Sequence, residues 1–418
     1  MQHSIDWHDD AINAVSAERA TVGDLRLVLN NQNVTKHILN DTLVDHVTVA
    51  LYGLADGLVH DWWTIFGARD REISLQKYRT GYLIPDIRLQ FDGAAFQVSA
   101  RQSVYTDPDL RFWGGTTEIM DRTQAEIWLS EFIGEVIARL ESKGLHETSA
   151  ALRWRRVQSS RRSSEREFCE AAGSLGLDPY QIEDKVAQFI ERAEIQFGDE
   201  ALVEFVSGSG DVDHSRLIDW VDRMARYKGF GYRLADLRPL VDEITSNIPS
   251  HEGTQPWAAG YRRARAMRGA LCLKQNERAM SFFDLARRFG AHKNYGLAPR
   301  VDGINALRRE TPNGIDVHVR NHGHDAAETA HRFALARAIG DAACFPEPQT
   351  APINRLRNAY RQAAGRAFAA EFLAPIDEIR SMQEDERDVY TISEEFGVSP
   401  AVIEHQIENT HRIDQACA

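Results

Sequence analysis

The sequence predicts an α+β protein with a mixed strand and helix N-terminal domain, a helical middle region and a mainly helical C-terminal domain. Residues 20–105 contain short alternating apolar runs separated by turn residues, which is typical of strands. Beyond residue 125, apolar residues recur at helical spacing. A chain of 418 residues exceeds one ordinary domain, and 43% apolar residues suffice for real cores. We therefore divide it into domains at 1–150, 151–255 and 256–418.

Composition excludes several classes of protein. The net charge of -13 disfavours nonspecific binding of nucleic acid by the whole surface, because phosphate backbones repel an acidic protein. The four cysteines form no Cys-x-x-Cys pair, which argues against a zinc ribbon and suits a reducing compartment. No run of 18 apolar residues and no signal-peptide pattern occurs. We expect a cytoplasmic protein that does not span a membrane.

The first domain is predicted from alternation and turn signals. Leu54–Phe66 is predicted as a helix between strands, and its adjacent Trp62 and Trp63 should point in different directions. Ala125–Lys143 is predicted as a long amphipathic helix that Gly144 ends. The predicted strands are Val22–Leu29, Val44–Leu51, Ile84–Phe91 and Ala95–Val98.

A basic run opens the middle region. Residues 153–166 hold six arginines and one acid, with Trp154 among them. Arginines beside an aromatic ring suit phosphate contacts and base stacking, so we consider Arg153, Arg155, Arg156, Arg161 and Arg162 as contacts to nucleic acid or to a partner. The alternative is a salt-bridged connector within an acidic protein.

Residues 168–195 resemble a helix-turn-helix, because a Gly-Leu-Asp-Pro turn separates two helical stretches. The second stretch carries Glu183 and Asp184 beside a single Lys185. A recognition helix needs donors for base edges and phosphates, so a plain helical connector is the alternative.

The third domain is predicted as helices around one strand, Gly314–Val319. The predicted helices are Gly260–Leu273, Phe282–Phe289, Asp325–Cys344, Ile353–Leu373, Tyr390–Phe396 and Ala401–Ile413.

Four segments of this domain carry a specific resemblance. They are Trp257–Ala266, Arg332–Asp341, Arg366–Pro375 and Ile392–Ile403. In this order they resemble the ImmA/IrrE family of metallopeptidases, in which Arg-Phe-x-Leu-Ala precedes His-Glu-x-Gly-His and Asn-x-Phe-Ala-Ala-Glu follows. The resemblance spans about 160 residues, does not reach the first 250, and implies a zincin-like C-terminal domain.

The residues that would hold zinc are missing. Two His at i and i+4 on one helix face bind a single zinc ion, and the Glu between them acts as general base. Arg337 and Asp341 stand at the two His positions, Ala338 stands at the Glu position, and Arg366 stands at the family's Asn. Arginine offers no lone pair to a metal, and residues 361–370 contain no acidic ligand. We therefore predict no cofactor and no catalytic residue.

Two interpretations of the altered helix stay open. Arg337 and Asp341 are spaced to pair at i, i+4 and to fill the space of the metal. Alternatively, Arg337 binds an anionic group of a ligand.

A displaced metal site is a further alternative. His318, His322, His324, Glu328 and His331 lie just before or at the start of this helix, and Glu328 and His331 have i, i+3 spacing. Scattered histidines in a solvated loop would give the same pattern.

The favoured hypothesis is a regulatory or sensor protein that contains a pseudo-peptidase module and acts through a protein partner. By resemblance, we place it in stress, phage-defence or mobile-element regulation. A DNA-binding transcriptional regulator is the first alternative, and an active metallopeptidase with displaced ligands is the second. Partner identity and oligomeric state are left open.

Overall fold

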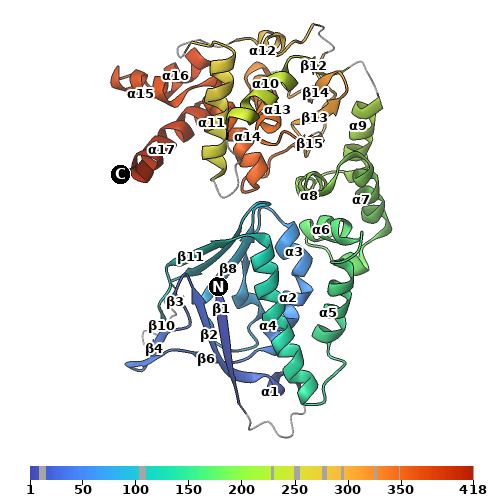
Figure 1. Cartoon of the computed structure of the whole chain (residues 1–418), viewed down its shortest axis with the longest axis vertical. Coiled ribbons are helices and arrows are strands. Elements are labelled where there is room, and N and C mark those ends of the chain that lie inside the picture. The colour runs from blue at the N-terminus through green and yellow to red at the C-terminus, as the bar shows by residue number, and fades with distance from the viewer. Residues whose placement is uncertain are drawn as a thin grey trace. The chain divides into compact units, whose positions relative to one another are not determined.

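The computed structural model describes residues 1–8, 16–102, 110–226, 230–248, 255–274, 280–292, 296–323, 327–347 and 349–417. It has a mixed helix and strand architecture, with 52% of residues in helices and 18% in strands. Strands gather in the N-terminal part and helices in the C-terminal part, as predicted. The chain forms two compact units, 1–187 and 188–418, coloured from blue to green and from green to red (Figure 1).

The first unit contains three antiparallel sheets. Their strand orders are β1-β2-β3 with β6 also on β2, β10-β4-β5, and β11-β9-β8-β7. The strands are β1 Gln2–Trp7, β2 Val22–Leu29, β3 Gln32–Asn33, β4 His37–Leu39, β5 Thr42–Val44, β6 Val47–Ala50, β7 Ile73–Ser74, β8 Asp86–Phe91, β9 Phe96–Arg101, β10 Leu110–Phe112 and β11 Thr116–Met120. The predicted strand Val22–Leu29 is confirmed with the same bounds. Every second residue along it is buried, as the alternating sequence indicated.

Helices cover these sheets and share one apolar core with them. They are α1 Ala17–Ala20, α2 Tyr52–His60, α3 Trp62–Gly67, η1 Leu75–Tyr78, α4 Arg122–Ser142, α5 Ser149–Ser160, α6 Arg166–Ser174 and η2 Pro179–Gln181. The predicted helix Leu54–Phe66 divides at Asp61 into α2 and α3. Helix α4 begins three residues earlier than predicted, because Asp121 and Gln124 form a capping box there.

Both tryptophans of α3 are buried, although adjacent helix positions point in different directions. Trp62 is 1% exposed and packs its ring against Phe66 and Trp154. Trp63 is 2% exposed and donates its indole N–H to the Tyr180 hydroxyl at 3.1 Å. Two different sets of neighbours enclose α3, so neither ring is left for a binding surface.

The second unit is mainly helical. Helix α7 crosses the division at residue 187, and the later helices belong wholly to this unit. The helices are α7 Asp184–Gln196, α8 Asp199–Ser207, α9 His214–Arg226, α10 Leu237–Asn247, α11 Pro256–Ala270, α12 Phe282–Arg288, α13 Ala327–Cys344, α14 Tyr360–Leu373, α15 Ile376–Glu384, α16 Val389–Phe396 and α17 Pro400–Cys417.

One antiparallel sheet of order β12-β14-β13-β15 belongs to this unit. Its strands are β12 Tyr232–Leu234, β13 Ala306–Thr311, β14 Gly314–Val319 and β15 Thr350–Ile353. Strand β14 was predicted with these bounds, whereas β15 occupies the start of the predicted helix Ile353–Leu373, so α14 begins only at Tyr360. Pairing with β13 from Ala306 to Arg309 holds residues 350–353 extended.

The segment 151–255 is shared between the two units. Helices α5 and α6 lie in the first unit, and α6 packs on α3. Helices α8, α9 and α10 lie in the second unit, where β12 pairs with β14 from Tyr232 to Leu234. Strand pairing thus joins residues assigned to the connector to the C-terminal sheet. Within the described ranges, no helix combines the length and apolarity needed to cross a bilayer.

Candidate functional site

Helix α13 occupies the middle of the second unit. It contacts β13, β14 and β15 on the sheet side and α10, α11, α12 and α14 on the others. From Ala334 to Cys344 every residue is buried, which explains why small apolar side chains dominate this stretch. A Cβ at Gly340 would lie 2.6 Å from the Phe368 ring, so glycine permits the close approach of α14.

The three positions that differ from the metal motif are enclosed. Arg337 is 5% exposed, Ala338 is fully buried and Asp341 is 1% exposed. Ala338 belongs to the apolar core of this unit. Charged side chains at such positions require partners, because isolated buried charges are strongly disfavoured.

Asp341 takes its partners from other elements. The guanidinium of Arg361 on α14 donates two hydrogen bonds to its carboxylate, from Nε to Oδ1 at 2.6 Å and from Nη2 to Oδ2 at 2.8 Å. Arg308 Nε on β13 lies 3.2 Å from Asp341 Oδ2. Burial alone raises the pKa of Asp341, but the neighbouring Arg361 and Arg308 outweigh it and hold the pKa below its usual value. Asp341 is therefore a carboxylate at neutral pH.

The predicted pair between Arg337 and Asp341 is wrong. Arg337 Nη2 donates to the Asn354 carbonyl and to Gln362 Oε1, each at 2.8 Å. The two-pronged geometry of Arg361 matches the carboxylate of Asp341, and helix packing places Arg361 beside it. Adjacent turns of one helix therefore use different partners despite their i, i+4 spacing.

Among the residues that the structure describes, no carboxylate forms a hydrogen bond or salt bridge with Arg337. Its burial, followed by the repulsion of Arg366, lowers its pKa to about 9. Its Nε is buried without a hydrogen-bond partner in the part of the chain that the structure describes. Arg337 thus holds a positive charge whose hydrogen-bonding capacity is only partly used.

A polar network beneath Arg337 was not predicted. Gln362 Nε2 donates to Glu204 Oε2 at 2.7 Å and to the Pro352 carbonyl at 2.8 Å. Asn354 Nδ2 donates to the Glu204 backbone carbonyl at 2.8 Å. Gln362 and Glu204 lie 158 residues apart, so no local pattern connects them. The sequence signal was the pair of long polar residues, 361 and 362, at the start of an alanine-rich helix.

Arg366 binds backbone carbonyls of the segment that precedes α14. It donates through Nη1 to the Leu356 carbonyl at 2.7 Å and through Nη2 to the Arg357 carbonyl. These contacts fasten the segment before α14 to the helix. The four predicted positions Arg337, Ala338, Asp341 and Arg366 therefore lie in one region of α13 and α14 but carry separate contacts.

The arrangement offers anion recognition rather than acid–base chemistry. Asp341 is engaged by two arginines, and Glu204 accepts a hydrogen bond from Gln362. The buried side chains Arg308, Arg337, Arg361, Asp341 and Glu204 carry three formal positive charges and two negative ones. One positive charge among these five groups is left without a matching negative charge.

Of the alternative metal candidates, His322 and His331 lie together, with ring centres 5.3 Å apart. His331 Nε2 accepts the backbone N–H of His322 at 3.0 Å, and the carboxylate of Glu328 accepts the N–H of Phe282. His318 is 4% exposed, and burial lowers its pKa to about 4. His324 lies outside the described residues. Among the residues that are described, no group of three or more His, Cys, Asp and Glu side chains could hold a metal ion.

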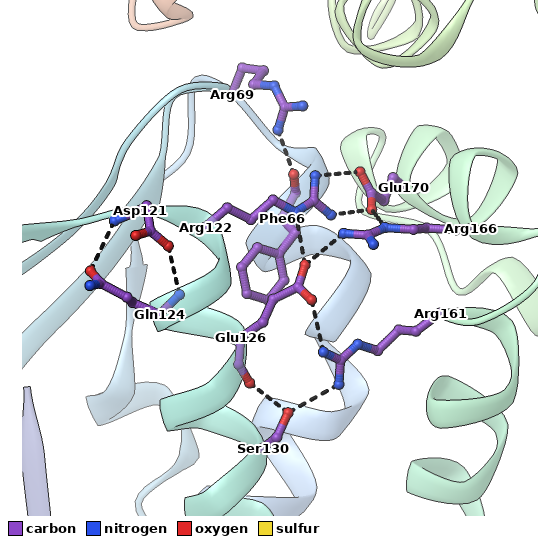
Figure 2. A network of polar contacts seen from close by, with 10 residues as sticks. All are labelled: Phe66, Arg69, Asp121, Arg122, Gln124, Glu126, Ser130, Arg161, Arg166 and Glu170. Atoms are coloured by element: carbon purple, nitrogen blue, oxygen red, sulfur yellow. Dashed lines mark hydrogen bonds and ion pairs between the residues drawn. The ribbon is translucent and has the colours of Figure 1, made fainter. Parts of the chain in front are cut away.

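Half of the arginines in the basic run are engaged within the first unit. Arg153 pairs with Asp178 at 2.8 Å. Figure 2 shows Arg161 and Arg166 both reaching Glu126 of α4, at 2.8 Å and 2.7 Å, and Arg166 also reaching Glu170. Arg122 pairs with the same two carboxylates, so Glu126 and Glu170 join α4, α5 and α6.

The remaining arginines of the run are exposed. Arg155 Nη2 donates to the His146 carbonyl, and the Arg156 guanidinium lies 6.0 Å from the centre of the Tyr180 ring. Arg161 instead stacks on Trp62 at 4.5 Å. Arg155, Arg156 and Arg162 are thus the members of the run that still present charge to solvent. Three arginines of the run thus join helices of the first unit, and three are exposed.

The resemblance to a helix-turn-helix at 168–195 corresponds to α6, η2 and α7. Residues 169–174 of α6 are all buried. A Cβ at Gly173 would lie 2.3 Å from the backbone of Trp63, which shows how closely α6 packs on α3. Helix α7 continues into the second unit beyond Ala187. The first helix of this segment is a core element.

Comparisons with known proteins identify no relative. No family model, no curated protein and no solved structure matches the chain. The contacts around α13 and the motif resemblance carry the functional proposal.

Proposed function

We propose that this chain is a regulatory or sensor protein whose C-terminal part is a metallopeptidase-like module without a catalytic metal, and that it acts through a protein partner. By its resemblance to ImmA/IrrE proteins, we place it in stress, phage-defence or mobile-element regulation. The module would keep the helical frame of such a peptidase and use it for binding.

The observation that carries this proposal is the salt bridge of Asp341 with Arg361 and Arg308. A metal held by α13 would need ligands at positions 337 and 341 that point at one ion. Asp341 is instead bound by two guanidinium groups, and Arg337 brings a third positive charge to the neighbouring turn. Three arginines around this face oppose a divalent cation electrostatically.

A partner is expected because the module retains no general base for hydrolysis. Ala338 stands where the catalytic Glu of the motif would stand, and an alanine side chain accepts no proton. A module with such a fold but without this base would contribute through binding. The pairing of Arg153, Arg161 and Arg166 inside the first unit favours a protein partner over nucleic acid.

Elemental analysis of the full-length protein tests the absence of a catalytic metal. The protein, purified without chelator and then dialysed against zinc-free buffer, should retain far less than one zinc per chain. The matched variant His322→Ala, His331→Ala should retain the same trace amount. About one tightly held zinc per native chain, lost in the variant, would overturn the proposal and establish a displaced metal site.

Activity and partner capture test the remaining part. Native protein supplied with zinc should cleave no casein or denatured substrate above the rate of Arg337→Met. Cross-linking in the host cell should recover a protein on the native chain. Specific DNA retained at about 150 mM salt would favour a transcriptional regulator instead, because weak electrostatic binding is lost at that concentration.

A further inference from the structure

A cavity of about 280 Å³ lies beside the altered face of α13. Arg337 forms part of its wall, together with His322 from the segment after β14. Phe333, Ala334 and Val402 supply apolar surface, and the rest of the lining comes from Asn305, Thr329, Ala330 and Ser399. The volume is slightly below the range of about 300–1,000 Å³ that is typical of drug-sized sites, so a compact ligand fits best.

Two residues of the cavity wall each have an inaccessible polar atom that no described residue engages. Arg337 Nε and His322 Nε2 are both buried without a hydrogen bond among the described residues. The guanidinium of Arg337 is held in place by Asn354 and Gln362 through its other end, Nη2. Arg337 therefore holds a fixed positive charge in the cavity wall, and a fixed charge is a preorganised group for an anion.

Positive charge surrounds the cavity from several elements. Burial lowers the pKa of His322 to about 4, and the neighbouring Arg320, His331, Arg355 and Arg300 act in the same direction. Arg366 acts in the same sense on Arg337, whereas Asp341 and Glu204 oppose it. Asp302 is the acid that faces Arg320, at 3.6 Å, and its side chain is 67% exposed. Arg300, Arg320 and Arg355 lie outside the cavity lining, so they add positive charge near the cavity without contacting a ligand in it.

We propose that this cavity binds a small organic carboxylate, with its anionic group beside the charge of Arg337 and its compact apolar body against Phe333 and Val402. A single negative charge matches the one unbalanced positive charge among the five buried groups around Asp341 and Glu204. The apolar walls favour a hydrocarbon or aromatic body over a free inorganic ion.

The inference does not depend on the proposed regulatory role. Arg337 would bind a carboxylate in this way whether or not the module descends from a peptidase and whether or not a protein partner exists. If the protein also acts as a sensor, this cavity is the site at which a metabolite with a carboxylate group would bind.

Calorimetric titration of the full-length protein with benzoate tests the proposal, with benzamide as the neutral analogue and phenyl phosphate as the doubly charged one. Benzoate should bind saturably at one site per chain. The affinity for benzamide should be lower by about tenfold or more, because neutral benzamide cannot accept charge-assisted hydrogen bonds as an anion does. Phenyl phosphate should bind no better than benzoate.

Three variants locate the site. Arg337→Met removes the charge, and Ala330→Leu narrows the cavity while leaving Arg337 in place. Each substitution should lower the affinity for benzoate about tenfold or more. Arg287→Met, which alters an arginine whose side chain is 62% exposed on α12, should leave the affinity within about twofold. If Arg337→Met does not fold, the affinity of Ala330→Leu for benzoate tests the location of the site.

Several results would overturn the proposal. They are no saturable binding of benzoate, equal binding of benzoate and benzamide, or full affinity in Ala330→Leu. Tighter binding of phenyl phosphate would overturn the assignment to a carboxylate. Zinc content and peptidase activity play no part in these measurements, so a failure here is distinct from a failure of the proposed function.

Discussion

At the scale of single residues, Asp341 is the most constrained charge of the second unit. It neutralises Arg361 and Arg308 in a setting that is only 1% exposed. Asp341→Asn should lower the free energy of unfolding by about 3–5 kcal/mol, because two buried guanidinium groups lose their counter-ion. Urea denaturation followed by circular dichroism measures the change.

The matched control is Asp242→Asn. Asp242 also faces an arginine, Arg238, at 3.5 Å on one helix, but its side chain is 65% exposed. Its loss should change stability by no more than about 1 kcal/mol. Equal effects of the two substitutions would contradict the role assigned to Asp341.

Double-mutant cycles separate the two arginines near Asp341. The coupling between Asp341 and Arg361, measured with leucine substitutions, should be about 0.5–3 kcal/mol, because their side chains are in direct contact. The cycle for Asp341 and Arg337 should give a smaller coupling, since Arg337 contacts Asn354 and Gln362. A larger coupling to Arg337 than to Arg361 would restore the i, i+4 pairing that the spacing suggested.

At the scale of elements, glycine sets the distance between α3 and α6. Gly173→Ala should destabilise the protein by about 1–3 kcal/mol, because its Cβ would lie 2.3 Å from the backbone of Trp63 and push the helices apart. Gly134→Ala in α4 is the control, since nothing lies within 4 Å of a Cβ there. Alanine at that position should stabilise α4 by up to about 1 kcal/mol. Thermal denaturation compares the two variants, and equal melting temperatures would argue against tight α3–α6 packing.

The arginine run should behave as a connection between helices. Arg161→Gln should cost about 1–3 kcal/mol of stability, because Glu126 and the Trp62 ring both lose a contact. Arg162→Gln, a substitution at an exposed position, should change stability by less than about 0.5 kcal/mol. Chemical denaturation measures both, and indistinguishable variants would reopen a nucleic-acid role for the run.

At the scale of the whole molecule, the division into two units predicts where the chain can be cut. Fragments 1–183 and 184–418 should each unfold cooperatively, because each retains its own apolar core. Fragment 256–418 should be unstable or aggregate, since it lacks β12 and the Glu204 contacts of Gln362 and Asn354. Calorimetry and heteronuclear NMR of the three fragments check this, and a well-folded 256–418 would favour a boundary at residue 255.

Sequence alone determined those features that depend on local periodicity. Strands β2 and β14 follow from alternation, and α4 follows from apolar residues at helical spacing. The loss of a His-Glu-x-x-His pattern could also be read directly, because it concerns which residue types occupy positions 337, 338 and 341.

Only the tertiary structure decided which charges meet. Spacing along α13 predicted a pair between Arg337 and Asp341, but Asp341 binds Arg361 from α14 and Arg308 from β13. Likewise, Arg161 and Arg166 are held by Glu126, which lies 35 residues before Arg161. Long side chains select partners by the packing of helices on each other, and packing depends on contacts far apart in sequence. Local spacing therefore identified the residues of the site, while their partners and the cavity beside Arg337 required the fold.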